Sequence, residues 1–235
     1  MFRPAYTRVD DPARLAAYLG DYPFGILTTA GADGEPMATH IPFLFREEGG
    51  PAGLLLGHMA RANPHWKALD GNRAARVIFP GPHGYISPAI YGEHPSVPTW
   101  NYAAVHAIGR PRALHDPEEL WHLLEAQIAA YESGRAEPWR PALPEEYRRR
   151  MIAGIVGVTM PVERLEGKFK LSQNRGVEDR RRVIAALQAE PHSGGRELGA
   201  FMAAQAEVVF PEVQDAQGGP EAEAASPAPA RAPER

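Results

Sequence analysis

The sequence predicts an α+β fold in which an antiparallel barrel or sandwich of short strands carries peripheral helices. Short apolar runs in the first half of the chain are separated by glycine- and proline-rich turns, and this punctuation favours a barrel or sandwich over a parallel sheet. Helical spacing of apolar residues is clearest after Asp116. With 235 residues, 44% of them hydrophobic, the chain is long enough to bury one core, so we expect a single main domain.

We expect the chain to open on a helix that covers the sheet. Asp11 can cap its N-terminus, Pro12 suits its first position and Gly20 can close it. Turn residues after the first strand-like run predict that the first two runs form a hairpin. The strand-like runs lie at 24–29, 37–45, 53–58, 76–79, 84–87 and 103–112.

The second half of the chain is predicted to be mainly helical. One helix begins at Asp116 and runs to about Tyr131, and a second covers 144–152. A strand follows at 155–160, and 168–171 extends that strand or pairs with it. A helix from Val177 to about Glu190 closes the domain. The predicted organisation is therefore a domain over 1–190, a C-terminal helix over 191–210 and a disordered Ala- and Pro-rich tail over 211–235.

Composition excludes several classes of function. The chain has no cysteine, which excludes disulfides, thiolate metal sites and thiol nucleophiles. Its apolar runs are far shorter than the roughly 20 residues that cross a bilayer, and its first residues lack the apolar segment of a signal peptide. We therefore expect a cytoplasmic protein without a membrane partner. A formal net charge of −4 gives no general attraction to nucleic acid, although a local basic patch can still provide one.

The segment 57–66 contains the first candidate site. Asn63 followed by Pro64 signals the start of a helix, and Arg61 lies just before it. Helix N–H groups and an adjacent guanidinium together suit a phosphate group. The alternative is a surface arginine beside an ordinary capped helix.

A second candidate site lies in 168–175. Alternation places Lys168, Lys170 and Ser172 on one side of an extended segment, where two cations and a hydroxyl group suit an anion. The same lysines are typical of an exposed strand edge that is protected from pairing. The residues from Ser172 to Arg175 also precede a helix, so their side chains can act as caps.

Aromatic and amide side chains near residue 100 form a third candidate site. Trp100 and a tyrosine flank Asn101, and a planar cofactor needs an apolar slot with a few well-placed hydrogen-bonding groups. Thr39 and His40 lie in the middle of a predicted strand, where Pro42 indicates a sheet edge or a bulge. The plainer alternatives are a core tryptophan and a half-buried histidine that bonds to a backbone carbonyl.

Several common sites are missing from the sequence. It contains no G-x-G-x-x-G, G-x-x-x-x-G-K-[ST] or G-x-S-x-G motif. Its nine histidines lack metal-ligand spacing, so no metal site is predicted. Two arginine triplets, 148–150 and 180–182, each follow acidic residues on a predicted helix. This pattern favours a salt-bridged surface, with contacts to DNA phosphates as the alternative.

Five segments occur in the order that marks one family of flavoproteins. They are Thr39 to Phe43, Gly57 to Trp66, Pro98 to Tyr102, Gly154 to Gly157 and Lys170 to Arg175. On these segments, and over about residues 1–190, the sequence resembles the PaiB-type FMN-binding negative transcriptional regulators. The order of five segments makes this resemblance more specific than any one of them.

The resemblance implies a six-stranded antiparallel split barrel, related to the pyridoxamine-phosphate-oxidase-like flavoproteins. It also implies a homodimer that places FMN between its subunits, and it places a basic residue at the phosphate, where the family often has lysine and this chain has Arg61. The cofactor-binding residues expected on this basis are Arg61, Lys170 and Arg175 at the phosphate, Thr39, His40 and Ser172 as hydrogen-bonding groups, Trp100 at the flavin ring, and His58, Asn63 and Asn101 around them.

Three functions remain open at this point. The leading hypothesis is a PaiB-like regulator that represses directly or through a flavin-linked signal. The indirect route is included because an acidic chain without a recognition helix is a poor DNA binder. The alternative is an FMN-dependent oxidoreductase that uses NADH or NADPH on a small substrate. A third hypothesis is a DNA-binding module that uses the arginine triplets. No catalytic residue is assigned.

Overall fold

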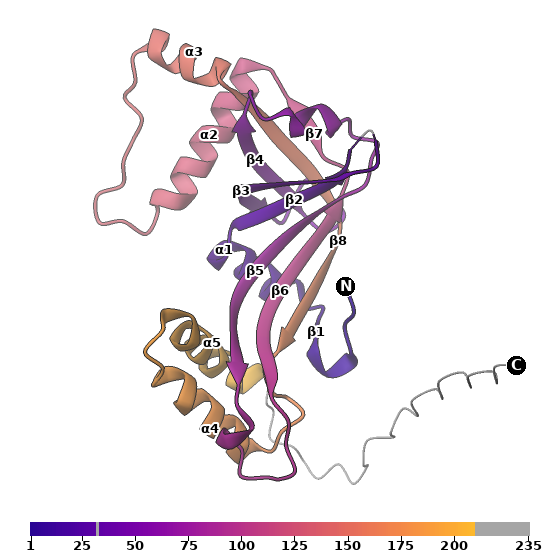
Figure 1. The fold of residues 1–235 in the computed structure, drawn as a ribbon. Coiled ribbons are helices and arrows are strands. Elements are labelled where there is room, and N and C mark those ends of the chain that lie inside the picture. Colours follow the sequence, from indigo (N-terminus) through magenta and orange to yellow (C-terminus); the bar gives the residue numbers. More distant parts are fainter. Residues whose placement is uncertain (32, 210–235) are drawn as a thin grey trace, which may run out of the picture.

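The structure, a computed structural model, describes residues 1–31 and 33–209 (Figure 1). The strands are β1 (Arg8–Val9), β2 (Phe24–Ala30), β3 (Pro36–Arg46), β4 (Leu54–Ala60), β5 (Ala75–Ile86), β6 (Thr99–Gly109), β7 (Arg112–Leu114) and β8 (Ile155–Lys170). The α-helices are α1 (Pro12–Asp21), α2 (Pro117–Glu132), α3 (Glu145–Ala153), α4 (Val177–Gln188) and α5 (Ser193–Val209). Short 3₁₀ helices lie at Ala5–Thr7, Pro64–Ala68 and Pro88–Ile90.

The six long strands of the described chain close into an antiparallel ring. They pair in the order β8-β4-β3-β2-β5-β6, and β6 pairs back to β8. The ring closes because residues 155–161 of β8 pair with β4, whereas residues 162–170 pair with β6. On the other edge of β8, the short strand β7 pairs with its first half and β1 pairs with its second half. The predicted six-stranded antiparallel split barrel with peripheral helices is confirmed.

The ring encloses an apolar core. Gly25 on β2 leaves room for it, because an added Cβ would lie only 2.8 Å from both Phe79 and Val77. The rings of Phe43 and Phe79 meet edge to face there, with centroids 5.9 Å apart. Since alternate residues of each strand fill this interior, the intervening residues point to the outer face of the sheet. Buried core residues include Leu27, Phe43, Leu55, Val77, Phe79, Val105, Val158 and Met160.

Two pairs of expected strands are continuous in the structure. The runs at 76–79 and 84–87 are both parts of β5, in which a bulge between Pro80 and His83 accommodates the Pro-Gly-Pro sequence. The runs at 155–160 and 168–171 are the two ends of β8. In β5 pairing with β6 resumes at His83 after the bulge, and in β8 pairing passes from β4 at Pro161 to β6 from Val162 onward, so the residues between the runs do not end either strand.

Pro42 does not mark a sheet edge or a bulge, which corrects the expectation. β3 pairs with β2 as far as Pro42 and with β4 from Phe43 onward. The proline therefore lies where the strand changes partner, a position that tolerates a residue without an N–H group. Its carbonyl accepts a hydrogen bond from Gln127 Nε2 of α2, at 3.3 Å.

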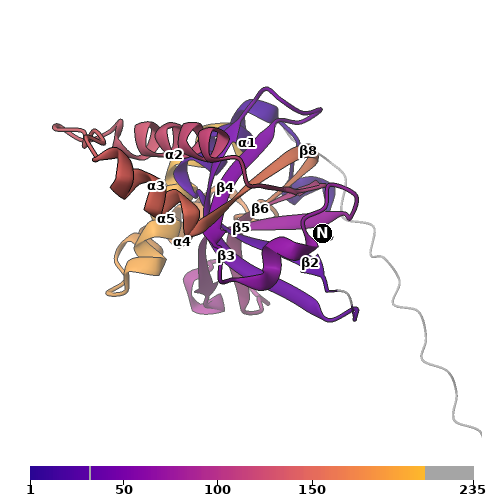
Figure 2. The same ribbon diagram turned by 90° about the horizontal axis from the view of Figure 1, so that it is seen from above.

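When the barrel is viewed from above, α2 to α5 lie on one side of it and β2 lies on the other (Figure 2). α2 packs on β3 and β4, and α4 and α5 pack together and against the β5–β6 end of the molecule. Among the described helices none combines the length and apolar character required to cross a membrane.

The helix expected at 191–210 forms as α5, and it is part of the same core as the strands. Leu198 and Met202 are fully buried, and the ring of Phe201 lies 5.2 Å from that of Phe169 on β8. An added Cβ on Gly84 of β5 would come within 3.0 Å of Leu198. The core therefore includes residues beyond the expected domain boundary at residue 190. The tail predicted at 211–235 lies outside the described residues.

Replacing Leu198 by alanine should lower the free energy of unfolding by about 2 to 5 kcal/mol, because it leaves a cavity between α5 and β5. Chemical denaturation followed by circular dichroism measures this change. The matched control is Leu143→Ala in the loop before α3, where Leu143 is 37% exposed and a change of at most about 0.5 kcal/mol is expected. Equal effects of the two variants would show that α5 does not belong to the cooperative core.

Candidate functional site

The residues expected to bind the cofactor fall into two groups, and β8 runs from the turn that carries Arg61 to the second group. The first group, on β3, β4 and the turn after β4, is Thr39, His40, His58, Arg61 and Asn63. The second group, at the start of β6 and around the end of β8, is Trp100, Asn101, Lys170, Ser172 and Arg175. Arg61 Nη2 donates to the carbonyl of Ile155, the first residue of β8, at 2.8 Å, whereas Lys170 is the last. At about 3.3 Å per residue, about 50 Å of strand separates them.

A buried histidine that the sequence analysis left without a role organises the first group. Nδ1 of His65 lies 2.7 Å from Thr39 Oγ1, and its Nε2 lies 2.8 Å from Thr29 Oγ1. Burial lowers the pKa of His65, so the imidazole is neutral and carries one N–H. One threonine therefore accepts a hydrogen bond from His65, and the other donates one to it.

Asn63 completes this network. Its Nδ2 donates to Thr39 Oγ1 at 3.1 Å, and its Oδ1 accepts from the backbone N–H of His65 at 3.0 Å. Asn63 thus caps the helix and also helps to hold His65 in position. Thr39 and Asn63 therefore bond both to each other and to His65.

The turn that carries Arg61 differs from the expected phosphate site. The helix after Asn63 is a 3₁₀ helix of five residues, so it lacks the row of N–H groups that a longer helix presents. Arg61 Nε and Nη2 donate to the carbonyls of Ala153 and Ile155, both at 2.8 Å. The guanidinium thereby joins the β4 turn to the junction of α3 and β8. A phosphate role for its remaining N–H groups stays a prediction.

His58 and His40 lie on different surfaces. His58 is half-buried beneath α2, with Nδ1 at 2.9 Å from Gln127 Oε1. His40 is exposed on the outer face of the sheet, next to the ring of Phe24 at 6.1 Å between centroids. Strand register continues from His40 across this face through Ile26, Ile78, His106 and Glu166.

Ser172 does not share a side with the two lysines, which corrects the expectation of a common face. β8 ends at Lys170, and Ser172 has a φ of 64°, in the left-handed region. Its side chain consequently turns into the interior, where Oγ accepts from Asn101 Nδ2 at 2.8 Å. Asn101 is fully buried, and its Oδ1 has no partner within the described part of the chain. Ser172 and Asn101 therefore fix the junction of β6 with the end of β8.

The exposed part of the second group is an aromatic shelf formed by Tyr85 and Trp100. These side chains are 49% and 54% exposed, and their rings meet at a steep angle with centroids 6.2 Å apart. Lys170 is half-buried nearby and donates to the hydroxyl group of a threonine at the start of β6. Arg175 lies over the ring of Tyr91, with 4.2 Å between its guanidinium carbon and the ring centroid. The shelf thus offers flat apolar surface beside a cation.

A charged cluster on the outer face was missed by the sequence analysis. Arg76 Nη1 donates to His106 Nδ1 at 3.0 Å, and burial together with the charge of Arg76 lowers the pKa of His106 to about 4. Burial alone would raise the pKa of Glu166, but hydrogen bonds from the Met1 amine and Arg164 lower it to about 2. Arg76, His106 and Glu166 come from β5, β6 and β8. In the sequence, only the alternation within each strand could have indicated that they share a face.

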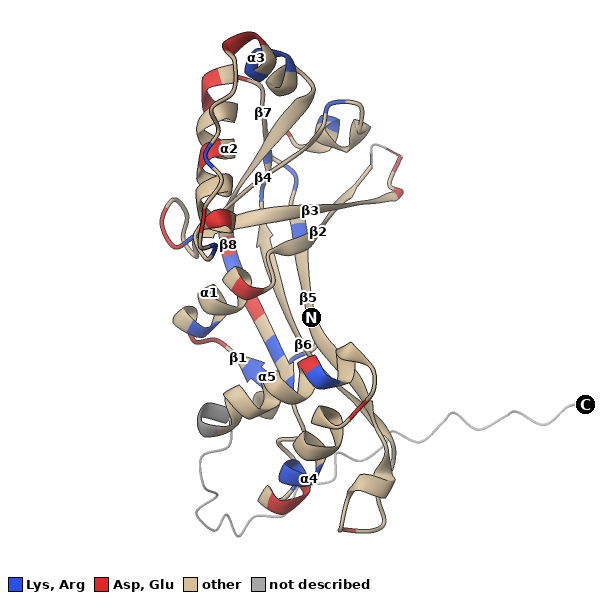
Figure 3. Ribbon diagram, turned by 90° about the vertical axis from the view of Figure 1, so that its left-hand side faces the viewer, with Lys and Arg blue, Asp and Glu red and all other residues tan. Residues whose placement is uncertain are grey.

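Neither arginine triplet is a free basic patch. Acidic residues lie beside the basic ones on α3 and α4 (Figure 3), and Arg180 is buried, with 4% exposure. Ion pairs join Arg149 to Glu145, Arg181 to Glu178, and Arg182 to Glu178 and Asp179. The arrangement agrees with a salt-bridged surface. Over residues 1–31 and 33–209 no group of three or more acidic or histidine side chains is placed to hold a metal ion.

His106 should make the stability of the fold depend on pH. Its pKa in the fold, about 4, lies below the ordinary value of 6.5. As the pH falls from about 6.5 to about 4, the unfolded chain therefore takes up a proton that the folded chain refuses, and the free energy of unfolding falls. The loss should be smaller in His106→Gln, as measured by urea denaturation at a series of pH values. The exposed His122→Gln is the control, and identical profiles for wild type and His106→Gln would contradict the assignment.

A split barrel that combines cations with an exposed aromatic shelf defines a flavin-binding protein of the split-barrel class. The family model described as "Putative FMN-binding domain" matches residues 1–164. The chain belongs to this family, and FMN is the cofactor for which the family is described.

The relatives agree with the family and confirm the resemblance to PaiB-type proteins. The chain is 33% identical over 204 residues to "Protease synthase and sporulation protein PAI 2" of Bacillus subtilis, which covers 86% of this chain and 96% of that protein. It is 36% identical over 217 residues to an uncharacterized protein of Emericella nidulans, over 74% of this chain and 85% of that one.

Solved structures show the same fold. The flavocytochrome Anf3 from Azotobacter vinelandii matches with a TM-score of 0.55 and 18% identity over 72% of each chain. The FAD and heme binding protein from Mycobacterium smegmatis matches with a TM-score of 0.55 and 18% identity, over 77% of this chain and 80% of that one. At these identities the matches concern the fold alone.

Proposed function

We propose that two copies of this chain hold FMN between the first group of one copy and the second group of the other. The separation of the two groups carries this proposal. Between Arg61 and Lys170 there is about 50 Å of strand, far more than one FMN molecule spans. His40 and Trp100 share the outer face but lie about 14 Å apart across the strands and about 20 Å apart along them. A second copy can bring the two groups together.

The outer face of the sheet is the surface that suits a second copy. Besides the shelf of Tyr85 and Trp100, it exposes Phe24, which is 57% exposed. The helices lie largely on the other side of the barrel (Figure 2). Large exposed aromatic side chains are typical of protein interfaces.

The residues present fit FMN. Lys170 supplies a cation beside an aromatic shelf, and the partner's first group supplies the ordered hydroxyl and amide of Thr39 and Asn63 together with the exposed Arg61. Cations suit the phosphate, and an aromatic surface with few hydrogen-bonding groups suits the ring. FMN, when bound, supplies electron and hydride transfer. The task of these side chains is to bind and orient it, and His65 keeps Thr39 and Asn63 in position.

The proposed biological role is that of a cytoplasmic PaiB-type regulator. The identity to the B. subtilis protein extends over nearly all of both chains, which supports a shared role. Because Arg149, Arg181 and Arg182 of the two triplets form ion pairs within the chain, we propose that the state of the flavin is passed to a partner rather than to DNA directly. Anaerobic mixing with NADPH tests this role, since a regulator should reduce its FMN slowly, whereas reduction at many turnovers per second would indicate an oxidoreductase.

Reconstitution with FMN should give a stable complex with flavin absorbance, and Arg61→Ala should weaken its binding by about 1.5 to 3 kcal/mol, as expected for a hydrogen bond to a charged group. Equilibrium dialysis with fluorescence detection measures the affinity. The control is Arg149→Ala on α3, which removes an equivalent charge from an exposed ion pair. Circular dichroism establishes that both variants are folded, and equal affinities would remove Arg61 from the site.

Mixing two defective subunits tests whether the site is shared. Arg61→Ala and Lys170→Ala subunits are refolded together at equal amounts and reconstituted with FMN. If one site uses Arg61 of one subunit and Lys170 of the other, about half of the dimers are mixed, and each carries one intact site. About a quarter of all sites then regain wild-type affinity. No recovery in a mixture that contains mixed dimers would mean that both residues act within one subunit, or that they bind no FMN.

A further inference from the structure

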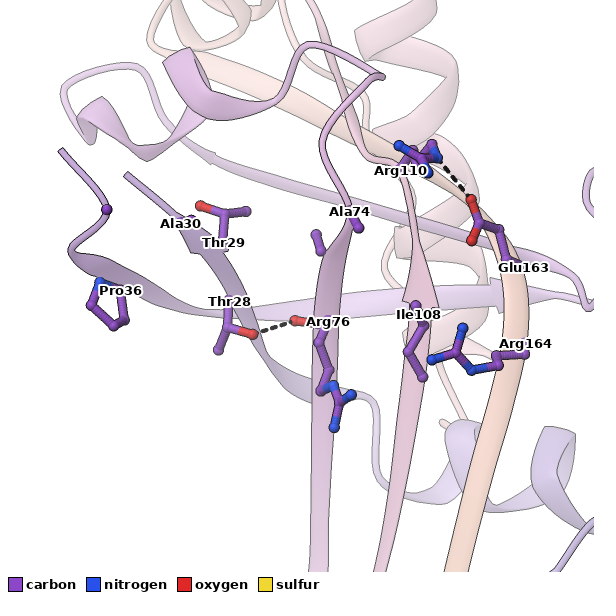
Figure 4. A pocket seen from close by; sticks show the side chains of 12 residues that line it. Thr28, Thr29, Ala30, Pro36, Ala74, Arg76, Ile108, Arg110, Glu163 and Arg164 are labelled. Atoms are coloured by element: carbon purple, nitrogen blue, oxygen red, sulfur yellow. Dashed lines mark hydrogen bonds and ion pairs between the residues drawn. The ribbon is translucent and has the colours of Figure 1, made fainter. Parts of the chain in front are cut away.

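The outer face carries a pocket that the proposed flavin site does not use. It encloses about 620 Å³ between the ends of β2, β5 and β6 and the middle of β8 (Figure 4). Thr28, Arg76, Ile108 and Arg164 line it in register across these four strands. All of these residues belong to one chain.

The lining of the pocket is strongly cationic. Arg76 and Arg164 project on either side of Ile108 (Figure 4), and Arg110 follows the end of β6. Glu163, which pairs with Arg110 Nε at 3.0 Å, is the single carboxylate among the described residues that line the pocket. Arg164 Nε also donates to Glu166 at 3.2 Å, but that carboxylate is shared with the Met1 amine.

Arg76 is oriented by a neutral side chain and forms no close ion pair with the part of the chain that the structure describes, although its charge contributes to the low pKa of Glu166. Within the described residues no carboxylate oxygen lies within 4.0 Å of its guanidinium, and the partner of its Nη1 is Nδ1 of His106. An imidazole nitrogen that accepts a hydrogen bond carries no proton, and the low pKa of His106 keeps the ring neutral at pH 7. The charge of Arg76 is thus held at the pocket, and the other N–H groups of its guanidinium remain for a ligand.

The donors of the pocket select the chemistry of its ligand. Thr28 Oγ1 already donates to the carbonyl of Arg76 at 2.9 Å, so the guanidinium groups are the main donors. They match a group that only accepts hydrogen bonds and can be gripped by two N–H groups at once, as phosphate can. The volume lies within the range of about 300 to 1,000 Å³ found for small-molecule sites, which leaves space for an organic part.

We propose that this arginine pocket binds the phosphate group of a phosphorylated compound of nucleotide size, at a site separate from that of FMN. Arg76 and Arg164 grip the phosphate from two sides, His106 positions Arg76, and Arg110 adds long-range attraction at the rim. Thr29 also lines the pocket, and its hydroxyl group bonds to His65. The pocket therefore shares a wall with the network that holds Thr39 and Asn63.

Calorimetric titration of the FMN-loaded full chain at low salt tests the proposal, with 5′-AMP, adenosine and inorganic phosphate as probes. We expect 5′-AMP to bind, adenosine not to bind, and inorganic phosphate to compete with 5′-AMP at lower affinity. Arg164→Gln should weaken 5′-AMP about 10- to 100-fold, the loss expected for a hydrogen bond between charged groups. Because the Arg164 side chain is 56% exposed, this variant should fold even if Arg76→Gln does not. Arg149→Gln on α3 is the matched control and should bind 5′-AMP as the wild type does.

Four results would overturn the proposal. The first is that 5′-AMP fails to bind, and the second is that it binds wild type and Arg164→Gln equally. Equal affinity for phosphate and 5′-AMP would show that the free ion is the ligand and that the organic part is not recognised. Release of FMN by 5′-AMP would show that the pocket holds the flavin phosphate. The subunit-mixing experiment does not involve this pocket, so failure of one proposal is distinguishable from failure of the other.

Discussion

The change of partner along β8 is the constraint on which the rest of the structure depends. One uninterrupted strand pairs first with β4 and then with β6, and this closes the ring. The same strand carries its first residue beside the Arg61 turn and its last beside the aromatic shelf. Barrel closure and the distance between the two groups of cofactor-binding candidates are therefore consequences of one feature. A shorter or broken β8 would bring the groups closer and would also open the barrel.

Much of the fold was predictable because local signals decide it. The caps at Asp11 and Asp116 and the prolines after them place two helices within one or two residues of their observed ends. Short apolar runs between glycine- and proline-rich turns indicated the strands of the first half. What local signals did not give was continuity. β5 was predicted as two strands, and for β8 the sequence left open whether 168–171 extends the strand at 155–160 or pairs with it, whereas pairing with neighbouring strands makes each of them continuous. Pairing is a long-range interaction, and it is invisible in a window of a few residues.

The candidate site was predictable in composition but not in arrangement. The segments around Arg61 and Lys170 were identified, whereas Ser172 turned inward because its left-handed backbone leaves the face of the lysines. His65 and His106 were missed for a common reason. Each is held by partners from other strands, at Thr29 and Thr39 for His65 and at Arg76 for His106. Burial keeps both rings neutral, so each histidine can accept a hydrogen bond and orient a neighbour without adding a charge.

The exposed aromatic residues argue that the outer face is completed by another surface. Phe24, Trp100 and Tyr85 are each about half exposed, and burying a large apolar side chain fully is worth about 1.5 to 3 kcal/mol. The chain could hide such residues beneath a helix, as α2 covers His58. It leaves them uncovered on the face that also carries His40 of the first group and Lys170 of the second. A second copy that covers this face gains apolar contact and completes a cationic, aromatic crevice at the same time, so binding of the flavin and association of the chains should reinforce each other.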